Sequence, residues 1–233
     1  MKEHALWALG AVAVLSQLAC SRPPAEIGPI SADPALVEAL DWYTGVAGRV
    51  DDARARELLE DAAEDQDPIS MMWLARVHST GRMGYPEDKN RARDLAATVI
   101  QQITAAADAG VLEAVFLVGT AYDEGLGVDE DPGRAFEWHK KAGEAGHVLG
   151  AHNTGNGYAA GRGVEQDLAA AVDWWTRAAE RGDAITQLRL GEAYEAGRGV
   201  EADPETALHW YGLAAASGNA AAEQAMERLT LRD

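Results

Sequence analysis

Histidine is the side chain that most often binds metal ions or transfers protons near neutral pH, and this chain of 233 residues contains six. The closest pair, His147 and His152, is five residues apart, so on a helix the two rings face about 140° away from each other. His78, His139 and His209 are scattered along the chain. This spacing does not suit a shared metal ion, and we expect solvated surface histidines without a bound metal.

Nucleophilic and acid–base side chains also lack the companions that catalysis needs. Ser70, Ser79 and Ser217 have no His and Asp residues at a patterned spacing. Paired carboxylates, such as Asp123 and Glu124, fall near expected helix ends, where solvated surface charge accounts for them. The Gly-x-Gly pairs follow expected helices and lack a subsequent Lys-Ser or Lys-Thr, so they are turn residues rather than a phosphate-binding loop. We therefore expect neither an enzyme nor a cofactor.

The overall charge narrows the choice of partner. Twenty Lys and Arg residues stand against 38 Asp and Glu residues, which gives a formal net charge of -18. This charge disfavours nucleic acid and anionic membrane surfaces, because both are bound through basic side chains. A basic segment of a protein or peptide is the partner that this charge favours, with salt-sensitive binding.

A repeat of 36 residues runs through the second half of the chain. Its clearest mark is a Gly-x-Gly-Val segment at 125–128, 161–164 and 197–200. The same period carries four further residue types, namely Tyr122, Tyr158 and Tyr194; Gly119, Gly155 and Gly191; Ala135, Ala171 and Ala207; and Trp138, Trp174 and Trp210. Self-similarity at a fixed period of this length is typical of stacked structural units.

Each unit is expected to form an antiparallel helical hairpin. Asp131, Asp167 and Asp203 precede the periodic alanine by four residues and are preferred N-caps for a second helix. Alanine and tryptophan at spacings of three and four give that helix one apolar face, on which the tryptophans are expected to anchor the core. The periodic glycine inside the first helix is unfavourable by about 1 kcal/mol, which close approach of a neighbouring helix would offset.

The pattern continues towards the N-terminus in weaker form, and the chain ends in a lone helix. Residues 90–108 are expected to form an elongated second helix, because an insertion of two turns returns the apolar face nearly to its place. The fold class is therefore all-α, a solenoid of about five antiparallel hairpins plus a C-terminal capping helix. The expected segments are a signal peptide (1–19), a tether (20–34), an atypical N-terminal hairpin (35–66), a repeat with an elongated second helix (67–110), three regular repeats (111–146, 147–182 and 183–218) and the capping helix (219–233).

The run from Ala114 to Trp138, with its Gly-x-Gly-Val turn, resembles the Sel-one-like repeat (SLR), a relative of the tetratricopeptide repeat. The resemblance covers residues 112–218 closely and 35–110 loosely. It implies a superhelical protein-interaction scaffold whose first helices line the concave face. Some secreted bacterial members carry a cysteine pair in each repeat, and β-lactam binding or hydrolysis has been proposed for them. An envelope enzyme of that type is the alternative function, although this chain lacks those cysteines.

Departures from the repeat indicate where a partner would bind, because packing does not dictate those positions. Residues 151–157 are polar and glycine-rich, and such low helix propensity often marks a functional site. The expected partner-binding stripe along the first helices consists of Leu117, Thr120, Asn153, Asn156, Arg189 and Glu192. The alternatives are an ordinary solvated face and a locally frayed helix without a role.

The N-terminus has the features of an export signal. The apolar run 5–15, interrupted only by Gly10, is too short to span a bilayer but fits the apolar region of a secretory signal. Leu-Ala-Cys-Ser, with the single cysteine at Cys20, resembles the processing site of bacterial lipoproteins, in which the cysteine is lipidated. Ser21 after this cysteine resembles the outer-membrane sorting pattern. The alternative is an ordinary signal peptide or uncleaved anchor with an incidental thiol.

These observations together predict an exported scaffold or adaptor of the bacterial cell envelope. We expect a periplasmic outer-membrane lipoprotein, attached to the membrane only through Cys20, that binds an unidentified protein or peptide on its concave face. A purely structural spacer is a third possibility.

Overall fold

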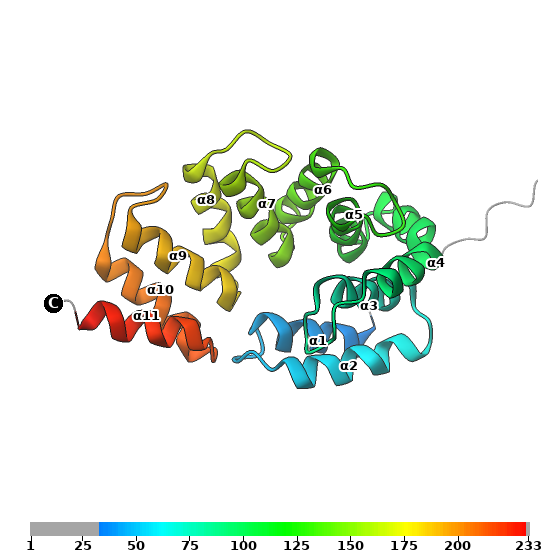
Figure 1. The fold of residues 1–233 in the computed structure, drawn as a ribbon, viewed down its shortest axis with the longest axis horizontal. Coiled ribbons are helices and arrows are strands. Elements are labelled where there is room, and N and C mark those ends of the chain that lie inside the picture. Colours follow the sequence, from blue (N-terminus) through cyan, green and yellow to red (C-terminus); the bar gives the residue numbers. More distant parts are fainter. Residues whose placement is uncertain (1–32, 232–233) are drawn as a thin grey trace, which may run out of the picture.

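A computed structural model describes residues 33–231, and within this range every regular element is a helix (Figure 1). The expected signal peptide, Cys20 and most of the expected tether lie outside the described residues. The helices are α1 (Pro34–Thr44), α2 (Asp52–Glu64), α3 (Pro68–Thr80), α4 (Lys89–Asp108), α5 (Leu112–Glu124), α6 (Pro132–Glu144), α7 (Val148–Ala160), α8 (Leu168–Ala179), α9 (Ala184–Ala196), α10 (Pro204–Ala216) and α11 (Ala220–Thr230). They pair into five hairpins followed by a single helix, which confirms the all-α solenoid.

An aspartate begins the second helix of every hairpin. The side chains of Asp51, Asp88, Asp131, Asp167 and Asp203 each accept a hydrogen bond from a backbone N–H in the first turn of the helix that follows. A cap of this kind stabilises a helix by about 1 kcal/mol. Short local signals of this sort place the helix starts where the sequence predicts them.

The Gly-x-Gly turns need glycine for two different reasons. Their first glycines, Gly125, Gly161 and Gly197, end a helix in the left-handed conformation, with φ between 64° and 66°. The second glycine of a turn also lacks room for a side chain, since a Cβ on Gly163 would lie 2.0 Å from the carbonyl oxygen of Pro132. The turn therefore packs against the preceding second helix, which fixes the stacking of one hairpin on the next.

The α3–α4 turn has the same shape with other residues. Gly81 ends α3 with φ 65°, and the buried Met83 adopts the left-handed conformation that glycine has in the later turns. Arg82 between them therefore occupies the position that Arg162 and Arg198 hold in the turns after α7 and α9. This correspondence places three arginines at equivalent points of the solenoid.

The periodic glycines of the first helices allow a ring of the following helix to approach closely. At each glycine, an added Cβ would lie within 2.5 Å of a ring atom, which real side chains do not tolerate. The three pairs are Gly119 with His139, Gly155 with Trp175 and Gly191 with Tyr211. The expected close approach of a neighbouring helix is thereby confirmed.

The expectation that the periodic tryptophans anchor the core needs correction. Trp174 is buried, but Trp138 and Trp210 are only half-buried. The residue after each tryptophan is the one in the core, and at His139 only 4% of the surface is exposed. The next residue on a helix points about 100° further round, so the centre of the buried face falls one position later than the identical residues indicate.

The solenoid bends into an arc whose two ends meet (Figure 1). The backbone N–H of Val50, in the α1–α2 turn, donates to the carbonyl oxygen of Ser217 at the end of α10 across 2.8 Å. Beside it, a Cβ on Gly45 would lie 3.3 Å from the Cβ of Ala184. The first helices thus line the inner face of this arc. None of the helices between residues 33 and 231 combines the length and the hydropathy that a bilayer crossing requires.

Candidate partner-binding site

Two adjoining cavities lie on the inner side, between consecutive hairpins. The first, of about 360 Å³, is called the His139 cavity here, and its lining includes Arg76, Glu124, His139, Asn153, Asn156 and Arg162. The second, of about 410 Å³, is called the Trp175 cavity, and its lining includes Asn156, Leu168, Trp175, Arg189, Glu192 and Arg198. Asn156 and Ala160 line both cavities, so the two adjoin along α7, and together they are called the depression here.

The two cavities occupy the same position in successive repeats. Their lining residues correspond at a spacing of 36, in the pairs His139 and Trp175, Asn153 and Arg189, Asn156 and Glu192, and Arg162 and Arg198. The repeat therefore determines where a cavity forms, because the same helix ends and the same turn surround it each time. The residue types that differ between repeats determine its chemistry.

Four of the six expected partner-binding residues line these cavities. Asn153 and Asn156 belong to the His139 cavity, and Asn156, Arg189 and Glu192 belong to the Trp175 cavity. Leu117 and Thr120 do not join them, because their exposed fractions are 0% and 1%. Helix α5 lies in the middle of the solenoid and has no free face between Ala114 and Ala121, so these two side chains cannot contact a partner.

The polar helix α7 is continuous over 13 residues, so the alternative of a frayed helix is incorrect. Its glycines serve packing. A Cβ on Gly150 would lie 2.8 Å from the Cβ of Ala142, and one on Gly157 would lie 2.8 Å from Cδ2 of Phe136. Tight contact with the neighbouring helices therefore offsets the low helix propensity, while the two asparagines remain at the cavities.

His139 is a buried, neutral histidine rather than a solvated one. Burial, followed by the nearby charge of Arg76, lowers the pKa of His139 to about 3. The neutral ring can accept a hydrogen bond, and Nδ2 of Asn153 donates to Nε2 of His139 across 3.2 Å. Thr120 Oγ1 lies 3.5 Å from the same ring nitrogen. His139 thus fixes the orientation of Asn153 at the cavity.

Arg76 is the buried cation of the His139 cavity, with only 4% of its surface exposed. Its Nε lies 3.7 Å from Oε1 of Glu124, and the guanidinium carbon lies 4.7 Å from the ring centre of Trp73. Burial lowers the pKa of Arg76 and raises the pKa of Glu124. Glu124 is therefore not the solvated surface carboxylate that the sequence predicts, and neighbouring Asp123 pairs with Arg162 across 3.1 Å.

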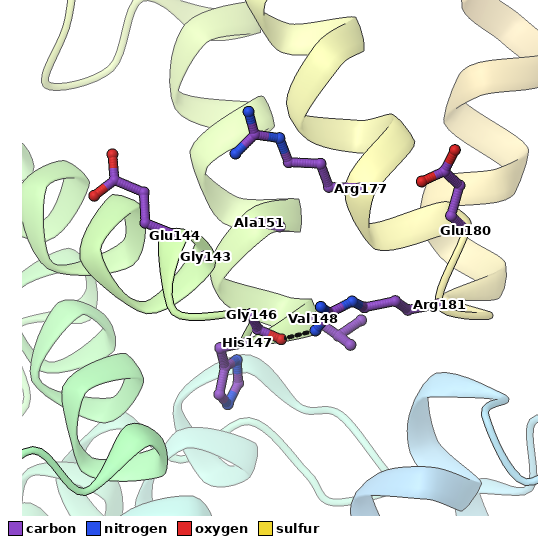
Figure 2. Close-up of a pocket in the computed structure, with 9 residues that line it drawn as sticks. All are labelled: Gly143, Glu144, Gly146, His147, Val148, Ala151, Arg177, Glu180 and Arg181. Carbon is purple, nitrogen blue, oxygen red and sulfur yellow. Dashed lines mark hydrogen bonds between the residues drawn. The ribbon is translucent and has the colours of Figure 1, made fainter.

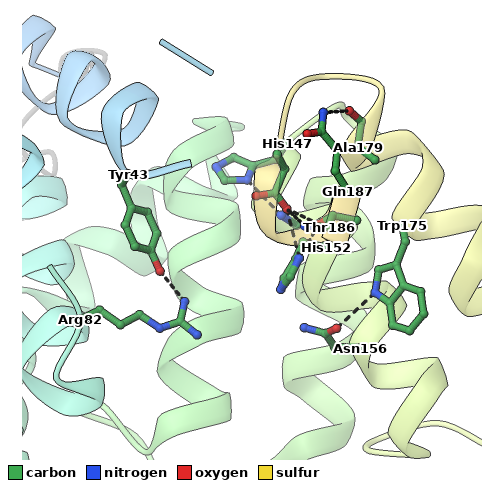
Figure 3. A network of polar contacts seen from close by, with 11 residues as sticks. Tyr43, Arg82, His147, His152, Asn156, Trp175, Ala179, Thr186 and Gln187 are labelled. Atoms are coloured by element: carbon green, nitrogen blue, oxygen red, sulfur yellow. Dashed lines mark hydrogen bonds and ion pairs between the residues drawn. The ribbon is translucent and has the colours of Figure 1, made fainter. Parts of the chain in front are cut away.

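Trp175 gives the second cavity a different wall. Its indole Nε1 donates to Oδ1 of Asn156 across 3.2 Å (Figure 3). Arg189 is exposed and Glu192 is half-buried at the same cavity. One wall of this cavity is therefore aromatic, and charged side chains of both signs lie at its edge.

His78 is also buried rather than solvated, and its Nε2 accepts a hydrogen bond from Nε of Arg91. The half-buried His147 and the buried His152 stabilise the start of α7 and its contact with α9. His147 accepts from the N–H of Gly150 through Nδ1, so its Nε2 carries the hydrogen and donates to Glu113 across 2.9 Å. His152 Nδ1 lies 2.6 Å from Oγ1 of Thr186 and 3.2 Å from Oδ2 of the buried Asp183 (Figure 3). Each ring has its own partners, and the sequence contained no periodic signal for these contacts.

A third cavity, of about 240 Å³, lies at the α6–α7 turn against the end of α8 (Figure 2). Arg181 closes it by donating through Nη1 to the carbonyl oxygen of Gly146, and Arg177 stacks on Trp174 with 4.3 Å between the guanidinium carbon and the ring centre. The two arginines of this cavity are therefore engaged in contacts with the protein itself. No cluster of three or more His, Cys, Asp or Glu side chains suited to a metal ion occurs within residues 33–231.

Stacked helical hairpins around a polar inner face define a helical-repeat scaffold, a class that typically mediates protein–protein interaction. The chain belongs to the Sel1 repeat family, whose model matches residues 39–67, 68–97, 112–147, 148–183 and 184–219. Solenoids of this family are typically non-catalytic interaction scaffolds. Comparison with curated proteins gives no match.

The solved structures that are similar to this chain include two further proteins with this fold. A Sel1 repeat protein from Oxalobacter formigenes is 32% identical, with a TM-score of 0.53, over 77% of this chain and 50% of that one. A protective antigen of uropathogenic Escherichia coli with an SLR fold is 26% identical, with a TM-score of 0.55, over 84% of this chain and 48% of that one. The present chain thus spans about half the length of both relatives.

Proposed function

We propose that this protein is an exported, lipid-anchored scaffold of the bacterial cell envelope that binds a protein or peptide on its inner face. The observation that carries the proposal is the pair of adjoining cavities, which place Asn153, Asn156, Arg189 and Glu192 along one depression. A depression that runs across two repeats suits an extended segment better than a small compact ligand.

The proposed localisation is based on the N-terminal sequence. The apolar run 5–15 followed by the single cysteine, Cys20, supports export and lipid attachment of an outer-membrane lipoprotein facing the periplasm. We expect radiolabelled palmitate to label the full chain and not the Cys20→Ala variant. Equal labelling of both would contradict the lipid anchor.

The overall charge and the local charge of the binding face favour different partners. A net charge of -18 favours a partner that is basic overall, because attraction between opposite charges acts over about 10 Å at 0.1 M salt. Arginines, in contrast, are the most numerous charged residues that line the two cavities. Direct contacts in the cavities therefore need not follow the overall charge.

The binding role is tested by affinity capture from detergent-solubilised envelope followed by mass spectrometry. The wild type and the Arg189→Glu variant are compared, with Glu137→Gln as the matched control, since Glu137 is exposed on α6 outside both cavities. We expect a protein retained by the wild type and the control and lost with Arg189→Glu. Equal capture by all three would contradict binding at the inner face.

A β-lactam-hydrolysing enzyme is the alternative that one direct assay decides. The scaffold account predicts no turnover of a chromogenic β-lactam by the purified protein. Turnover by the purified protein that is lost when the cavity residues are substituted would contradict the scaffold function.

A further inference from the structure

Arg76 lies at the bottom of the His139 cavity without a full set of partners. The side chain is 4% exposed, its Nε has no hydrogen-bond partner, and its ion pair with Glu124 spans 3.7 Å, well beyond a charge-assisted hydrogen bond. Oε2 of Glu124 is also buried without a partner. Burying a charge with incomplete pairing costs several kcal/mol, so an under-paired guanidinium beside a cavity points to a ligand that completes it.

The surroundings of Arg76 hold the guanidinium in place before any ligand arrives. The guanidinium carbon lies 4.7 Å from the ring centre of Trp73 and 5.2 Å from that of Phe116, two rings that are themselves stacked on each other. Trp73 is itself held by its Nε1, which donates to Oε1 of Glu113 across 2.7 Å. A cation fixed in this way loses little conformational entropy when it binds an anion, which favours tight recognition.

The other arginines of the two cavities extend this cationic character along the inner face. Arg82 donates to the hydroxyl of Tyr43, which carries no charge (Figure 3). Among the described residues, Arg82, Arg189 and Arg198 form no ion pair. In a chain where acidic residues outnumber basic ones by 38 to 20, this concentration of unpaired arginines is opposite in sign to the molecule as a whole.

We propose that the inner face binds an extended acidic segment of a polypeptide, with one side-chain carboxylate on Arg76 in the His139 cavity and another beside Arg189 and Arg198 in the Trp175 cavity. The proposal deepens the proposed function and rests on it. A guanidinium presents two parallel N–H groups that match the two oxygens of a carboxylate. An internal segment fits better than a chain end, because the depression continues from one cavity to the next through Asn156.

The segment's backbone has partners between the two carboxylates. Asn153 donates to His139 through Nδ2, so its Oδ1 is free to accept from a peptide N–H. Asn156 accepts from Trp175 through Oδ1, so its Nδ2 is free to donate to a peptide carbonyl. The two asparagines thereby offer one acceptor and one donor along the same helix, as an extended backbone requires.

The test uses three fluorescent octapeptides with blocked ends, in which alanine alternates with Glu, with Gln or with Lys. Binding to the full chain in detergent is followed by fluorescence polarisation, and the Nε–H signal of Arg76 is followed by NMR. We expect the Glu peptide to bind at least tenfold more tightly than the Gln and Lys peptides and to shift the Arg76 signal. Preference for the Lys peptide, equal affinities, or no binding of the Glu peptide would overturn the proposal.

Variants locate the contact on the chain. Arg76→Gln should weaken binding of the Glu peptide at least tenfold. Arg76→Lys should weaken it less, because lysine keeps the positive charge but lacks the two parallel N–H groups of a guanidinium. Arg93→Gln, an exposed arginine of α4 outside both cavities, is the matched control and should leave binding unchanged. If Arg76→Gln fails to fold, Arg189→Gln at the exposed end of the depression makes the same test. An effect of Arg93→Gln equal to that of the cavity variants would contradict the assignment.

Failure of this proposal and failure of the proposed function give different results. If the Glu peptide does not bind but Arg189→Glu still abolishes capture of an envelope protein, the inner face binds a partner of another charge. If neither the peptide nor an envelope protein depends on the cavity residues, the scaffold function itself is contradicted.

Discussion

The His139 cavity and the Trp175 cavity have the same frame and different contents. Both lie between consecutive hairpins, against a ring that packs on a periodic glycine, and both have an arginine from the turn, Arg162 or Arg198. The first contains a neutral histidine and a buried, under-paired Arg76, whereas the second contains an indole and exposed charges. The repeat thus fixes the place of binding, and single substitutions within it fix what is recognised.

Substitution of a periodic glycine should destabilise the packing that is common to both cavities more than substitution of a cavity-lining side chain. Gly155→Ala places a Cβ 2.3 Å from Cδ1 of Trp175, and we expect a loss of about 2–3 kcal/mol in the free energy of unfolding from overpacking. Gly133→Ala is the matched control, because its Cβ would meet only Asp131 Oδ1, at 3.4 Å, and alanine favours the helix. Urea denaturation measures both. A Gly155→Ala variant as stable as the control would contradict the packing.

The buried histidine of the His139 cavity makes the stability of the protein sensitive to acid. The pKa of His139 is about 3 in the folded protein, whereas an unfolded histidine titrates near pH 6.5. Between these two values the unfolded chain binds more protons than the folded protein. The free energy of unfolding therefore falls as the pH falls through this range. His139 contributes roughly 1 kcal/mol per pH unit there. We expect His139→Gln to flatten the pH dependence measured by urea denaturation. Exposed His209→Gln should leave it unchanged, and an equal effect of both would contradict a buried neutral His139.

Substitution of one asparagine in each cavity is expected to cause a smaller loss of stability. Asn156→Ala removes the acceptor for Trp175 Nε1, and Asn153→Ala removes the donor to His139 Nε2. We expect each to cost about 1 kcal/mol of unfolding free energy. Only Asn156→Ala should change the fluorescence emission of Trp175. This emission is measured in a protein variant whose other tryptophans are replaced by phenylalanine. An emission change with Asn153→Ala alone would reverse the assignment.

The smallest effect on stability is expected where the effect on binding is large. Arg189 is exposed and forms no ion pair among the described residues, so Arg189→Gln should change the free energy of unfolding by less than about 0.5 kcal/mol. The same variant should weaken the Glu peptide. A loss of stability as large as that of Asn156→Ala would mean that Arg189 serves the fold rather than recognition.

The hairpins and their limits could be predicted from the sequence because their signals are local and recur. The aspartate caps and the glycine turns act within a few residues, and α4 was predicted at nearly its full length from the register of its apolar face. The sequence does not predict the position of the ring that packs on each periodic glycine, because its residue type does not recur. This position is occupied by His139, Trp175 and Tyr211, so the position recurs while the residue type does not.

The candidate site could be predicted only in part, because exposure depends on which helix covers which. Asn153, Asn156, Arg189 and Glu192 line the cavities, but α5 is covered by its neighbours, so Leu117 is buried. Arg76 holds the position in its own hairpin that Asn156 and Glu192 hold in later ones, but the residue type does not recur and the spacing to the next repeat is longer. It reaches the cavity because α3 packs beside α5 and brings Arg76 close to Glu124, 48 residues further along the chain.

We expect the partner to contact the inner face and not the outer surface. Site-specific photocrosslinking in cells distinguishes the two, with the crosslinker placed in turn at Asn153, Arg189 and the exposed Glu137 outside both cavities. We expect the same discrete adduct from Asn153 and Arg189 and none from Glu137. An adduct from Glu137 without one from Asn153 or Arg189 would contradict binding at the inner face.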